Sequence, residues 1–537
     1  MFKPESYYLD LFQVTPGTLE ELTGLGIREG GSYCDLFFEN TTYHELLLRD
    51  GIVSSGGFHI DYGVGIRVLK GDRTGYAYSE STDARSMRDA VKAASLIASS
   101  GPDRPLAPSA SILAPFDSAQ GPLRLSTAGG QGRLRQDQLR RGGQCVDADI
   151  YPDRARSVGS IDALCPQGAQ TPSRQDTPAT DYYPFERDWR AAEASGFVPF
   201  MESLQRKISA ADQRVLKVIV SLSDQVSDIM MYNSLGELTF DTRPMGTIAV
   251  SVVFGSDGKV ENKTVSRSFR TGAEMLTQEL LDEIASEAVS GIDERFAAKR
   301  PKGGQMPVVM GAGASGILLH EAMGHAFEAD FNRKGQSIFS GRIGEKVCRE
   351  EISIVDDGTI PGNRGAVNFD DEGVPGQNTF MVRNGVLESY LHDRISAAHF
   401  GVAPTGNGRR ESFRYAPIPR MRATYMLGGK STKEDIIASV KKGIYVDQFS
   451  NGQVQIGEGD FTFFVKSGVL IEDGRLTMPV KDINIIGNGP QALADITAVG
   501  NDPKVDDGAW TCGKGQSCPV SCGIPTVLVN NLTVGGE

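Results

Sequence analysis

A chain of 537 residues is too long for one hydrophobic core of ordinary size, so we expect at least two domains. Hydrophobic residues make up 39% of the chain and charged residues 23%, as in a soluble globular protein. The net charge of −13 argues against binding to nucleic acid or to an anionic membrane, and no apolar run approaches the roughly 18 residues of a membrane span.

The N-terminal residues and the cysteines bear on the cellular compartment. No basic segment followed by an apolar one opens the chain, so we expect no signal peptide. A sparse, odd number of cysteines in such a chain predicts reduced thiols and a cytoplasmic location. The cysteines are Cys34, Cys145, Cys165, Cys348, Cys512, Cys518 and Cys522.

Residues 1–100 are expected to form the first part of an N-terminal domain. Residues 33–78 read as a series of strands, and the Asp50-Gly51 dipeptide predicts a hairpin turn because both residues tolerate positive φ. The segment "SMRDAVKAASLIAS", residues 86–99, then has the pattern of a helix.

Residues 101–180 differ from the rest of the chain. They hold nine arginines, nine prolines and no lysine, and their apolar residues follow neither a strand period nor a helix period. Such a segment buries too little apolar surface to offset the entropy of ordering. A regulatory insert, a disordered insert and a non-native stretch such as a local frameshift are all compatible with this composition. The last two are favoured.

Residues 181–300 are expected to complete the N-terminal domain. A helix is predicted over 197–212, then strands over 214–240 and 246–269, with a hairpin turn at Asp257-Gly258. An amphipathic helix is predicted over 273–296, because its apolar residues recur every four positions. These residues are Leu276, Leu280, Ile284, Ala288 and Ile292.

Residues 301–537 are expected to form a second, C-terminal domain after a linker that contains proline and glycine. This region predicts one helix near its start, followed mostly by strands and tight turns. The fold class is therefore α+β, with an N-terminal mixed α/β domain and a C-terminal β-rich domain that carries this helix.

A glycine pattern precedes that helix. Gly311, Gly313 and Gly316 match the G-x-G-x-x-G dinucleotide fingerprint between an apparent strand and a helix. The fingerprint requires a second parallel strand about 20 residues later, whereas a polar, turn-rich segment follows here. We therefore interpret the glycines as a tight connection whose small residues let the helix pack close to a sheet.

Two histidines and a glutamate in "HEAMGH" form a candidate metal motif. His320 and His325 are five residues apart, so a regular α-helix would separate their side chains by about 140°. Both imidazoles reach one ion only where the helix is locally widened to a π-type turn or broken, and Gly324 would ease that distortion. Glu321 is then a candidate general base for a zinc-bound water. Taken alone, the spacing supports a metal site and two unrelated helix histidines about equally.

A catalytic zinc needs a third protein ligand. Glu328 lies three residues after His325, where it is a candidate ligand or a partner of that histidine. The other candidates are histidines and cysteines nearer the C-terminus: His392, His399, Cys512, Cys518 and Cys522. Arg409 and Arg410 are candidates for contacts with substrate carboxylates, although structural ion pairs are at least as compatible with them.

Several segments resemble the TldD branch of the TldD/PmbA metallopeptidase family, whose hallmark is H-E-x-x-x-H. The resemblance is carried by "GILLHEAMGHAFEADFNRKGQSIFSGRIGE", "DDGTIPGNRGAVNFDDEGVPGQNTFMVRNGVL", "PTGNGRRESFRYAPIPRM" and "GNDPKVDDGAWTCGKGQSCPV". It covers nearly all of residues 301–537 and extends more weakly over 1–100 and 182–300. Residues 101–180 have no counterpart in it.

The resemblance implies a zinc-dependent metallopeptidase that hydrolyses short or unfolded peptides. It assigns His320, His325 and Cys512 as zinc ligands and Glu321 as the catalytic residue. It also implies that the peptide binds as an added strand inside a chamber of two subunits, either with a PmbA-like paralogous chain or as a dimer of this chain. A non-catalytic peptide-binding scaffold subunit is the alternative function, and an NAD-dependent oxidoreductase is a third, weaker one.

Overall fold

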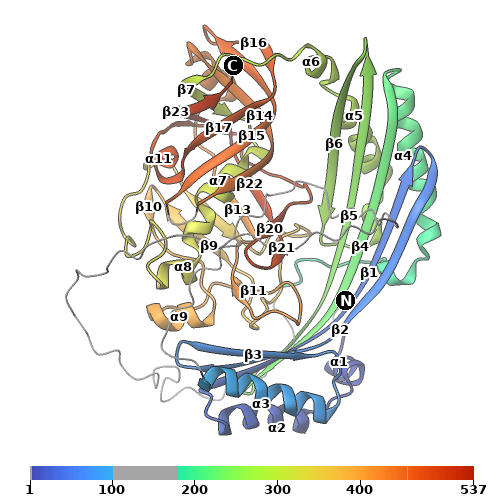
Figure 1. The fold of residues 1–537 in the computed structure, drawn as a ribbon, viewed down its shortest axis with the longest axis vertical. Helices are drawn as coiled ribbons and strands as arrows, with labels where there is room; N and C mark the ends of the chain where they lie inside the picture. The colour runs from blue at the N-terminus through green and yellow to red at the C-terminus, as the bar shows by residue number, and fades with distance from the viewer. Residues whose placement is uncertain (1–2, 101–179, 456–457, 537) are drawn as a thin grey trace, which may run out of the picture. The chain divides into compact units, whose positions relative to one another are not determined.

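The structure is a computed structural model that describes residues 3–100, 180–455 and 458–536 (Figure 1). The disordered or non-native segment predicted at 101–180 lies, except for its last residue, outside the described residues. Cys145 and Cys165 lie there too. The other five cysteines are all buried and unbridged.

The N-terminal region is built on an antiparallel sheet with the strand order β3-β2-β1-β4-β5-β6. Its turns at Asp50-Gly51 and Asp257-Gly258 have positive φ at both residues, as the primed hairpin turns require, so both predicted hairpins are confirmed. The strands are β1 Tyr33–Arg49, β2 Ile52–Lys70, β3 Arg73–Ser79, β4 Val215–Asn233, β5 Leu238–Ser256 and β6 Lys259–Phe269.

Helices cover parts of this sheet and form two hydrophobic clusters with it. One cluster joins β1 and β2 to α1 (Glu5–Phe12), α2 (Pro16–Arg28) and α3 (Ala84–Ser100). The other joins β4 and β5 to α4 (Val198–Ala211) and α5 (Gln278–Val289). The helices predicted at 86–99 and 197–212 are thus present.

The single helix predicted over 273–296 is wrong, because the segment is divided into three pieces. A 3-10 turn, Ala273–Met275, comes first, and the side chain of Thr277 then accepts a hydrogen bond from Leu280 N and caps α5. Gly291, with φ of 66°, separates α5 from α6 (Ile292–Ala297). The apolar residues predicted from the spacing are buried, except for Leu276, which is only partly buried.

The C-terminal region contains two larger sheets and two small hairpins. The first sheet has the order β10-β9-β8-β13-β22-β19. Its strands are β8 Ile354–Asp357, β9 Asn378–Arg383, β10 Val386–Leu387, β13 Ala423–Met426, β19 Lys504–Val505 and β22 Ser521–Ile524. The hairpins pair β11 (Gly408–Arg409) with β12 (Ile418–Pro419), and β20 (Thr511–Gly513) with β21 (Ser517–Pro519).

The second sheet has the order β14-β7-β23-β17-β15-β16, and pairing of β14 with β15 closes it into a ring. Its strands are β7 Gly304–Met310, β14 Lys442–Val454, β15 Asp460–Glu472, β16 Arg475–Val480, β17 Ile483–Asn488 and β23 Val527–Gly535, with β18 Ile496–Val499 beside β23. The helices of this region are short: α7 Ile317–Ala322, α8 Ala329–Arg333, α9 Arg394–Phe400, α10 Lys433–Ala438 and α11 Gly489–Ala494.

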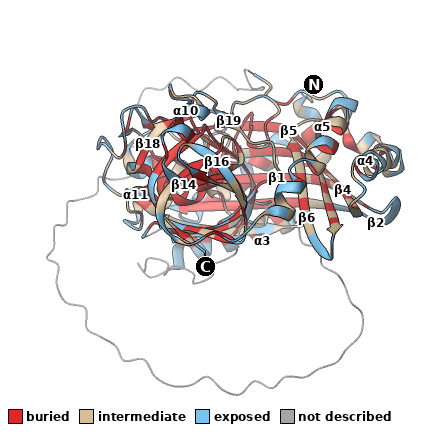
Figure 2. Cartoon of the chain, turned by 90° about the horizontal axis from the view of Figure 1, so that it is seen from above, coloured by how far each residue is buried: buried red, intermediate tan, exposed pale blue. Residues whose placement is uncertain are grey.

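One hydrophobic core takes residues from both of these sheets and from α7, whose residues are all buried. Buried residues, red in Figure 2, run along β14. Helices and extensive strands occur together, so the predicted α+β class is confirmed. None of the described helices is both long and apolar enough to cross a membrane.

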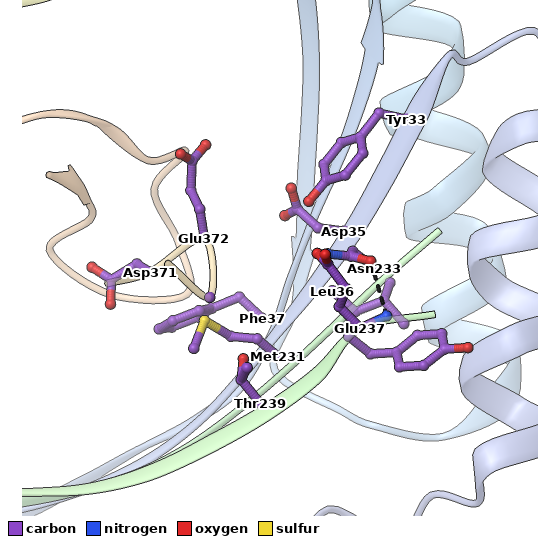
Figure 3. A pocket seen from close by; sticks show the side chains of 12 residues that line it. Tyr33, Asp35, Leu36, Phe37, Met231, Asn233, Glu237, Thr239, Asp371 and Glu372 are labelled. Carbon is purple, nitrogen blue, oxygen red and sulfur yellow. Dashed lines mark hydrogen bonds between the residues drawn. The ribbon is translucent and has the colours of Figure 1, made fainter. Parts of the chain in front are cut away.

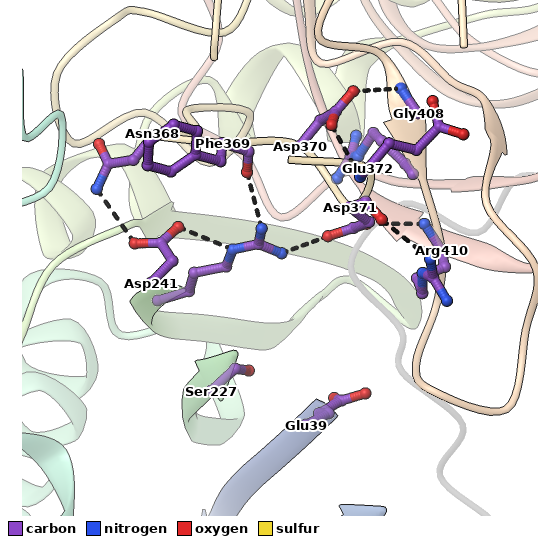
Figure 4. A network of polar contacts seen from close by, with 12 residues as sticks. Glu39, Ser227, Asp241, Asn368, Phe369, Asp370, Asp371, Glu372, Gly408 and Arg410 are labelled. Atoms are coloured by element: carbon purple, nitrogen blue, oxygen red, sulfur yellow. Dashed lines mark hydrogen bonds and ion pairs between the residues drawn. The ribbon is translucent and has the colours of Figure 1, made fainter. Parts of the chain in front are cut away.

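Buried ion pairs join the N-terminal sheet to C-terminal loops. Arg67 on β2 binds Asp35 and Glu372, and Arg243 on β5 binds Asp241 and Asp371 (Figure 4). Removal of one partner from such a pair costs about 3–5 kcal/mol, because it leaves a buried charge uncompensated. The described residues before and after the predicted domain boundary at residue 300 belong to one compact unit. The division into two domains stays a prediction.

Candidate metal centre

The connection from β7 to α7 brings His320 into the core. Gly313 has φ of 89°, and a Cβ on Gly316 would lie 2.5 Å from the backbone nitrogen of Gly523 in β22. Only glycine therefore lets the helix start this close to the sheet. The parallel neighbour of β7 is β14, far along the chain, so the dinucleotide interpretation is not supported and the close-packing interpretation is.

The helix breaks between the two histidines. Helix α7 ends at Ala322, Met323 has φ of −131° and ψ of −44°, and a 3-10 turn follows at Gly324–Phe327. The break, rather than a π-type widening, turns the ring of His325 toward that of His320, with ring centroids 5.2 Å apart. Gly324 is not in the left-handed region, and its role is space: a Cβ there would lie 2.1 Å from Met421 Sδ.

Three donor atoms converge at this break. One ligand atom each of His320, His325 and Cys512 lies within 4.8 Å of the others, and Cys512 Sγ is 3.3 Å from His325 Nε2. All three side chains are buried. Neither ring nitrogen of His320 has a hydrogen-bond partner within the described parts of the chain, which is costly for a buried polar group. Two imidazoles and a thiol, one of the imidazoles without a hydrogen-bond partner, form a ligand set that fits a zinc ion.

The electrostatics of the centre favour a thiolate. Burial raises the pKa of Cys512, but His325, Arg420 and His320 outweigh it and hold the pKa well below its ordinary value. Burial lowers the pKa of His325, but Cys512 and Glu328 outweigh it and raise the pKa. The thiolate is the form of cysteine that binds metals, so Cys512 is ready to act as a ligand.

A buried ionic network supports the second histidine. Glu328 Oε2 accepts a hydrogen bond from His325 Nδ1 at 2.9 Å and lies 3.0 Å from Lys514 Nζ. These two cations outweigh burial and lower the pKa of Glu328 to about 2. Arg420 holds the hairpin of Cys512 by donating to the carbonyl oxygens of Cys512 and Gln516. Lys514 and Arg420 were missed by the sequence reasoning, since only tertiary contacts bring them to the histidines.

Glu321 lies beside the three donors. Its Oε2 is 3.9 Å from His325 Nε2, and the side chain is buried. Burial raises its pKa, against the opposing effects of the two histidines. A buried carboxylate with a raised pKa next to a candidate metal centre has the properties of a general base.

The other candidate ligands lie elsewhere or have other partners. His392 packs between Tyr390 and Phe400, and His399 is exposed on α9. Cys518 accepts from Arg420, while burial raises the pKa of Cys522 and keeps it a neutral thiol. Glu328 is bound to His325 Nδ1, so it acts as that histidine's partner. Arg410 donates its backbone N–H to the Asp371 carboxylate, and its guanidinium donates to the Asp371 carbonyl oxygen and lies 3.7 Å from Asp35, the structural alternative expected for it.

A small pocket between β1 and the loop at 371–373 offers no second site (Figure 3). Its volume of ≈ 20 Å³ suits a water-sized molecule. The acidic residues around it are already used, since Asp35 and Glu372 bind Arg67 and Asp371 binds Arg243.

Sequence comparisons place the whole chain among metallopeptidase relatives. Models described as PmbA/TldA metallopeptidase domain 1, central domain and C-terminal domain match residues 34–98, 188–292 and 303–536. A metalloprotease TldD homolog from Haemophilus influenzae is 35% identical over 97% of this chain and 98% of its own length. A zinc metalloprotease TldD homolog from Saccharolobus solfataricus is 32% identical over 48% of this chain and 57% of its own length.

Solved structures share the fold at lower identity. A protein from Thermotoga maritima, described as a putative modulator of a DNA gyrase, is 20% identical with a TM-score of 0.67, covering 97% of this chain and 99% of its own. TldE from Thermococcus kodakarensis is 17% identical with a TM-score of 0.67, and the match covers 97% of this chain and 100% of TldE. Because all three family models and a near-full-length relative agree, this chain belongs to the PmbA/TldD metallopeptidase family.

Proposed function

We propose that this chain is a zinc-dependent peptidase in which His320, His325 and Cys512 hold the metal and Glu321 is the general base. The observation that carries the proposal is the convergence of three buried donors within 4.8 Å beside a buried carboxylate. The names of the relatives, which call them metalloproteases, support the same reaction class. Zinc, when bound, acts as a Lewis acid that lowers the pKa of water and polarises a carbonyl group.

Each residue of the centre has a distinct task. Glu328 fixes His325 by accepting from Nδ1, which leaves Nε2 directed at Cys512 as a ligand. Glu321 takes the proton of the attacking water and delivers it to the leaving amine of the cleaved peptide. Its raised pKa suits this role, because a carboxylate whose pKa is raised by burial is a stronger base than an exposed one.

The substrates that we propose are short or unfolded peptides. His320 and Cys512 are 0% exposed and Glu321 is 8% exposed, so the rigid surface of a folded protein does not reach them. Strand-like binding through the main chain of an extended peptide would accommodate varied sequences.

We also propose that the chain works in a two-subunit assembly, with a copy of itself or with a PmbA-like chain. Residues 52–62 of β2 have β1 on one side and no strand on the other among those the structure describes, because β3 pairs only from Val64 onward. This free edge carries four exposed apolar side chains: Ile52, Val53, Phe58 and Ile60. A long apolar edge of this kind is suited to pairing with another chain. Figure 2 shows the exposed end of β2.

The decisive experiment separates catalysis from metal binding. In Glu321→Gln, zinc content should stay stoichiometric while peptide hydrolysis falls by about 100-fold or more, because the base is lost and the ligands are kept. Glu350→Gln, an exposed change in the same region, is the matched control. Near-normal turnover in Glu321→Gln would refute the base assignment, and wild-type protein that binds peptides but never cleaves them would favour the scaffold alternative.

A further inference from the structure

A second, larger cavity lies between the N-terminal sheet and the C-terminal loops. Its volume is ≈ 360 Å³, and it is lined by strands β1, β4 and β5 on one side and by segments around 409–412 and 517–519 on the other. Exposed residues such as Glu45, Thr511 and Ser517 belong to its lining, so it is open to solvent. Six arginines line it: Arg243, Arg270, Arg364, Arg409, Arg410 and Arg422.

Two of these arginines are neutralised by carboxylates. Arg243 lies between Asp241 and Asp371, whose carboxylates are shown in Figure 4. Arg410 lies 3.7 Å from the Asp35 carboxylate and stacks on Phe37. The other four have no ion-pair partner among the residues that the structure describes. They are Arg270, Arg364, Arg409 and Arg422.

Three of these four donate hydrogen bonds from their guanidinium groups to uncharged acceptors. Arg409 donates to the carbonyl oxygens of Met421 and Pro519, and Arg422 donates to that of Gly406. Arg364 donates to Trp510 O, Ser268 Oγ and Thr511 Oγ1. These bonds fix the positions of the guanidinium groups, but their neutral acceptors supply no negative charge.

Arg270 is the arginine of this group whose buried guanidinium has the fewest hydrogen-bond partners. The residue is 6% solvent-accessible, and Nε and Nη1 are buried without a hydrogen-bond partner in the described residues. Its guanidinium lies 5.5 Å from the ring centroid of Tyr183. Burial, together with Arg243 and Arg409, lowers the pKa of Arg270 to about 10, and burial with Arg270 and Arg409 lowers that of Arg364 to about 9. An uncompensated buried charge of this kind is expensive unless a ligand of opposite charge repays it.

The nearby acidic residues do not supply that charge. Glu39 is bound to Thr41 Oγ1 and the backbone of Phe413, and Asp224 is bound to His44. Glu411 accepts from the backbone of Ser517, and Asp371 already serves Arg243. Asp370 and Asp371 act to raise the pKa of Arg422, and Asp241 acts to raise that of Arg270, but burial and the neighbouring arginines outweigh them. An anion from outside the described residues would therefore add compensating charge.

We propose that Arg270, Arg364, Arg409 and Arg422 form a binding site for a carboxylate of the peptide substrate. Guanidinium groups bind planar carboxylates through paired, charge-assisted hydrogen bonds, which gives both affinity and orientation. The carboxylate is either the C-terminal one or that of an aspartate or glutamate side chain. The inference rests on the proposed peptidase function and adds a preference for acidic groups to it.

The β20–β21 hairpin lies between the arginine site and the metal centre. In the β20–β21 hairpin, Cys512 lies opposite Cys518, while Thr511 lies opposite Pro519. Alternate residues of a strand face opposite sides, so Cys512 faces the histidines and Thr511 and Pro519 face the cavity. Arg364 and Arg409 bind this hairpin directly through Thr511 and Pro519, so an anion held by them is anchored behind the strand that carries Cys512.

The test uses three fluorescently labelled peptides of one neutral sequence. The first has a free C-terminal carboxylate, the second a C-terminal amide, and the third a C-terminal amide with one glutamine replaced by glutamate. Affinity is measured by fluorescence anisotropy with the zinc-loaded Glu321→Gln protein, so that no turnover is needed. At least one carboxylate peptide should bind about 10- to 100-fold more tightly than the neutral amide, as expected for hydrogen bonds to a charged group. Whichever peptide gains identifies the source of the carboxylate.

Arg270→Gln in the same background should remove this preference and leave binding of the neutral amide unchanged. Its melting temperature should not fall, since an uncompensated buried charge is removed. Arg383→Gln, at an exposed ion pair with Glu388, is the control and should keep the preference. Equal affinity for all three peptides, or a preference that survives Arg270→Gln, would overturn the inference. Absence of hydrolysis by wild-type protein would instead count against the peptidase function.

Discussion

Glu328 accepts a hydrogen bond from His325 Nδ1 at 2.9 Å, which leaves the other ring nitrogen 3.3 Å from Cys512 Sγ. The same carboxylate lies 3.0 Å from Lys514 Nζ, so one buried anion serves two cations. A carboxylate in this position selects the tautomer of a ligating histidine and raises its basicity. In the proposed zinc site, Glu328 thus orients His325 without needing to be a ligand itself.

Glu328→Gln should weaken zinc binding by about 10- to 100-fold, the range found for changes in groups that orient metal ligands. The amide carries no charge for Lys514 and is able to donate to Nδ1, which would favour the wrong tautomer. Competition with a chelator measures the affinity, and Glu350→Gln is the control. Unchanged zinc affinity in Glu328→Gln would show that His325 is oriented by its backbone alone.

Local signals in the sequence were sufficient for much of the fold. The hairpins at Asp50-Gly51 and Asp257-Gly258 depend on residues that tolerate positive φ, and such turns are set within a few residues. The division of 273–296 was missed because apolar spacing continues across Gly291, whereas the break depends on its left-handed conformation and on the Thr277 cap. Helices α1 and α2 were not anticipated.

The candidate metal centre was predictable only in part, because some of its residues are close in sequence and others meet only through tertiary contacts. His320, Glu321 and His325 are neighbours in sequence, so their spacing could be tested against helix geometry. Cys512 is brought to them by the β20–β21 hairpin, and periodicity does not predict contacts over such a separation; it was identified through the family resemblance. The buried cations Lys514 and Arg420 act through tertiary contacts and left no local signal.

The free edge of β2 predicts the assembly state. Light scattering should give a mass above the 57.8 kDa of one chain, either for the protein alone or after coexpression with a PmbA-like chain. Phe58→Glu should reduce that mass, because a charge on an apolar edge opposes pairing with another strand. Leu96→Glu, at an exposed position on α3, should not. An active species with the mass of one chain would contradict the proposed assembly.

His392 predicts a loss of stability in acid. Burial lowers its pKa from 6.5 to about 4, so below pH 6.5 the unfolded chain binds a proton that the folded chain does not. The free energy of unfolding is unaffected by this group above pH 6.5 and decreases as the pH falls toward 4. The decrease amounts to about 2 kcal/mol by pH 5. His392→Phe should therefore show a smaller fall in melting temperature between pH 7 and pH 5. The exposed change His399→Gln should behave like the wild type, and equal falls in all three proteins would contradict the argument.

Cys512 provides the sharpest test of the metal centre. A thiolate binds zinc at about 2.3 Å and is softer than the carboxylate or imidazole groups that would replace it. Cys512→Ala should lose zinc and abolish hydrolysis. Cys518→Ala and Cys522→Ala should keep both, at the cost of a modest loss of packing, because neither thiol belongs to the converging donors. X-ray absorption at the zinc edge should show one sulfur and two imidazole nitrogens around the ion. A spectrum without sulfur, or full activity in Cys512→Ala, would remove Cys512 from the centre and leave Glu328, the nearest remaining buried donor to His325, to be tested as the third ligand.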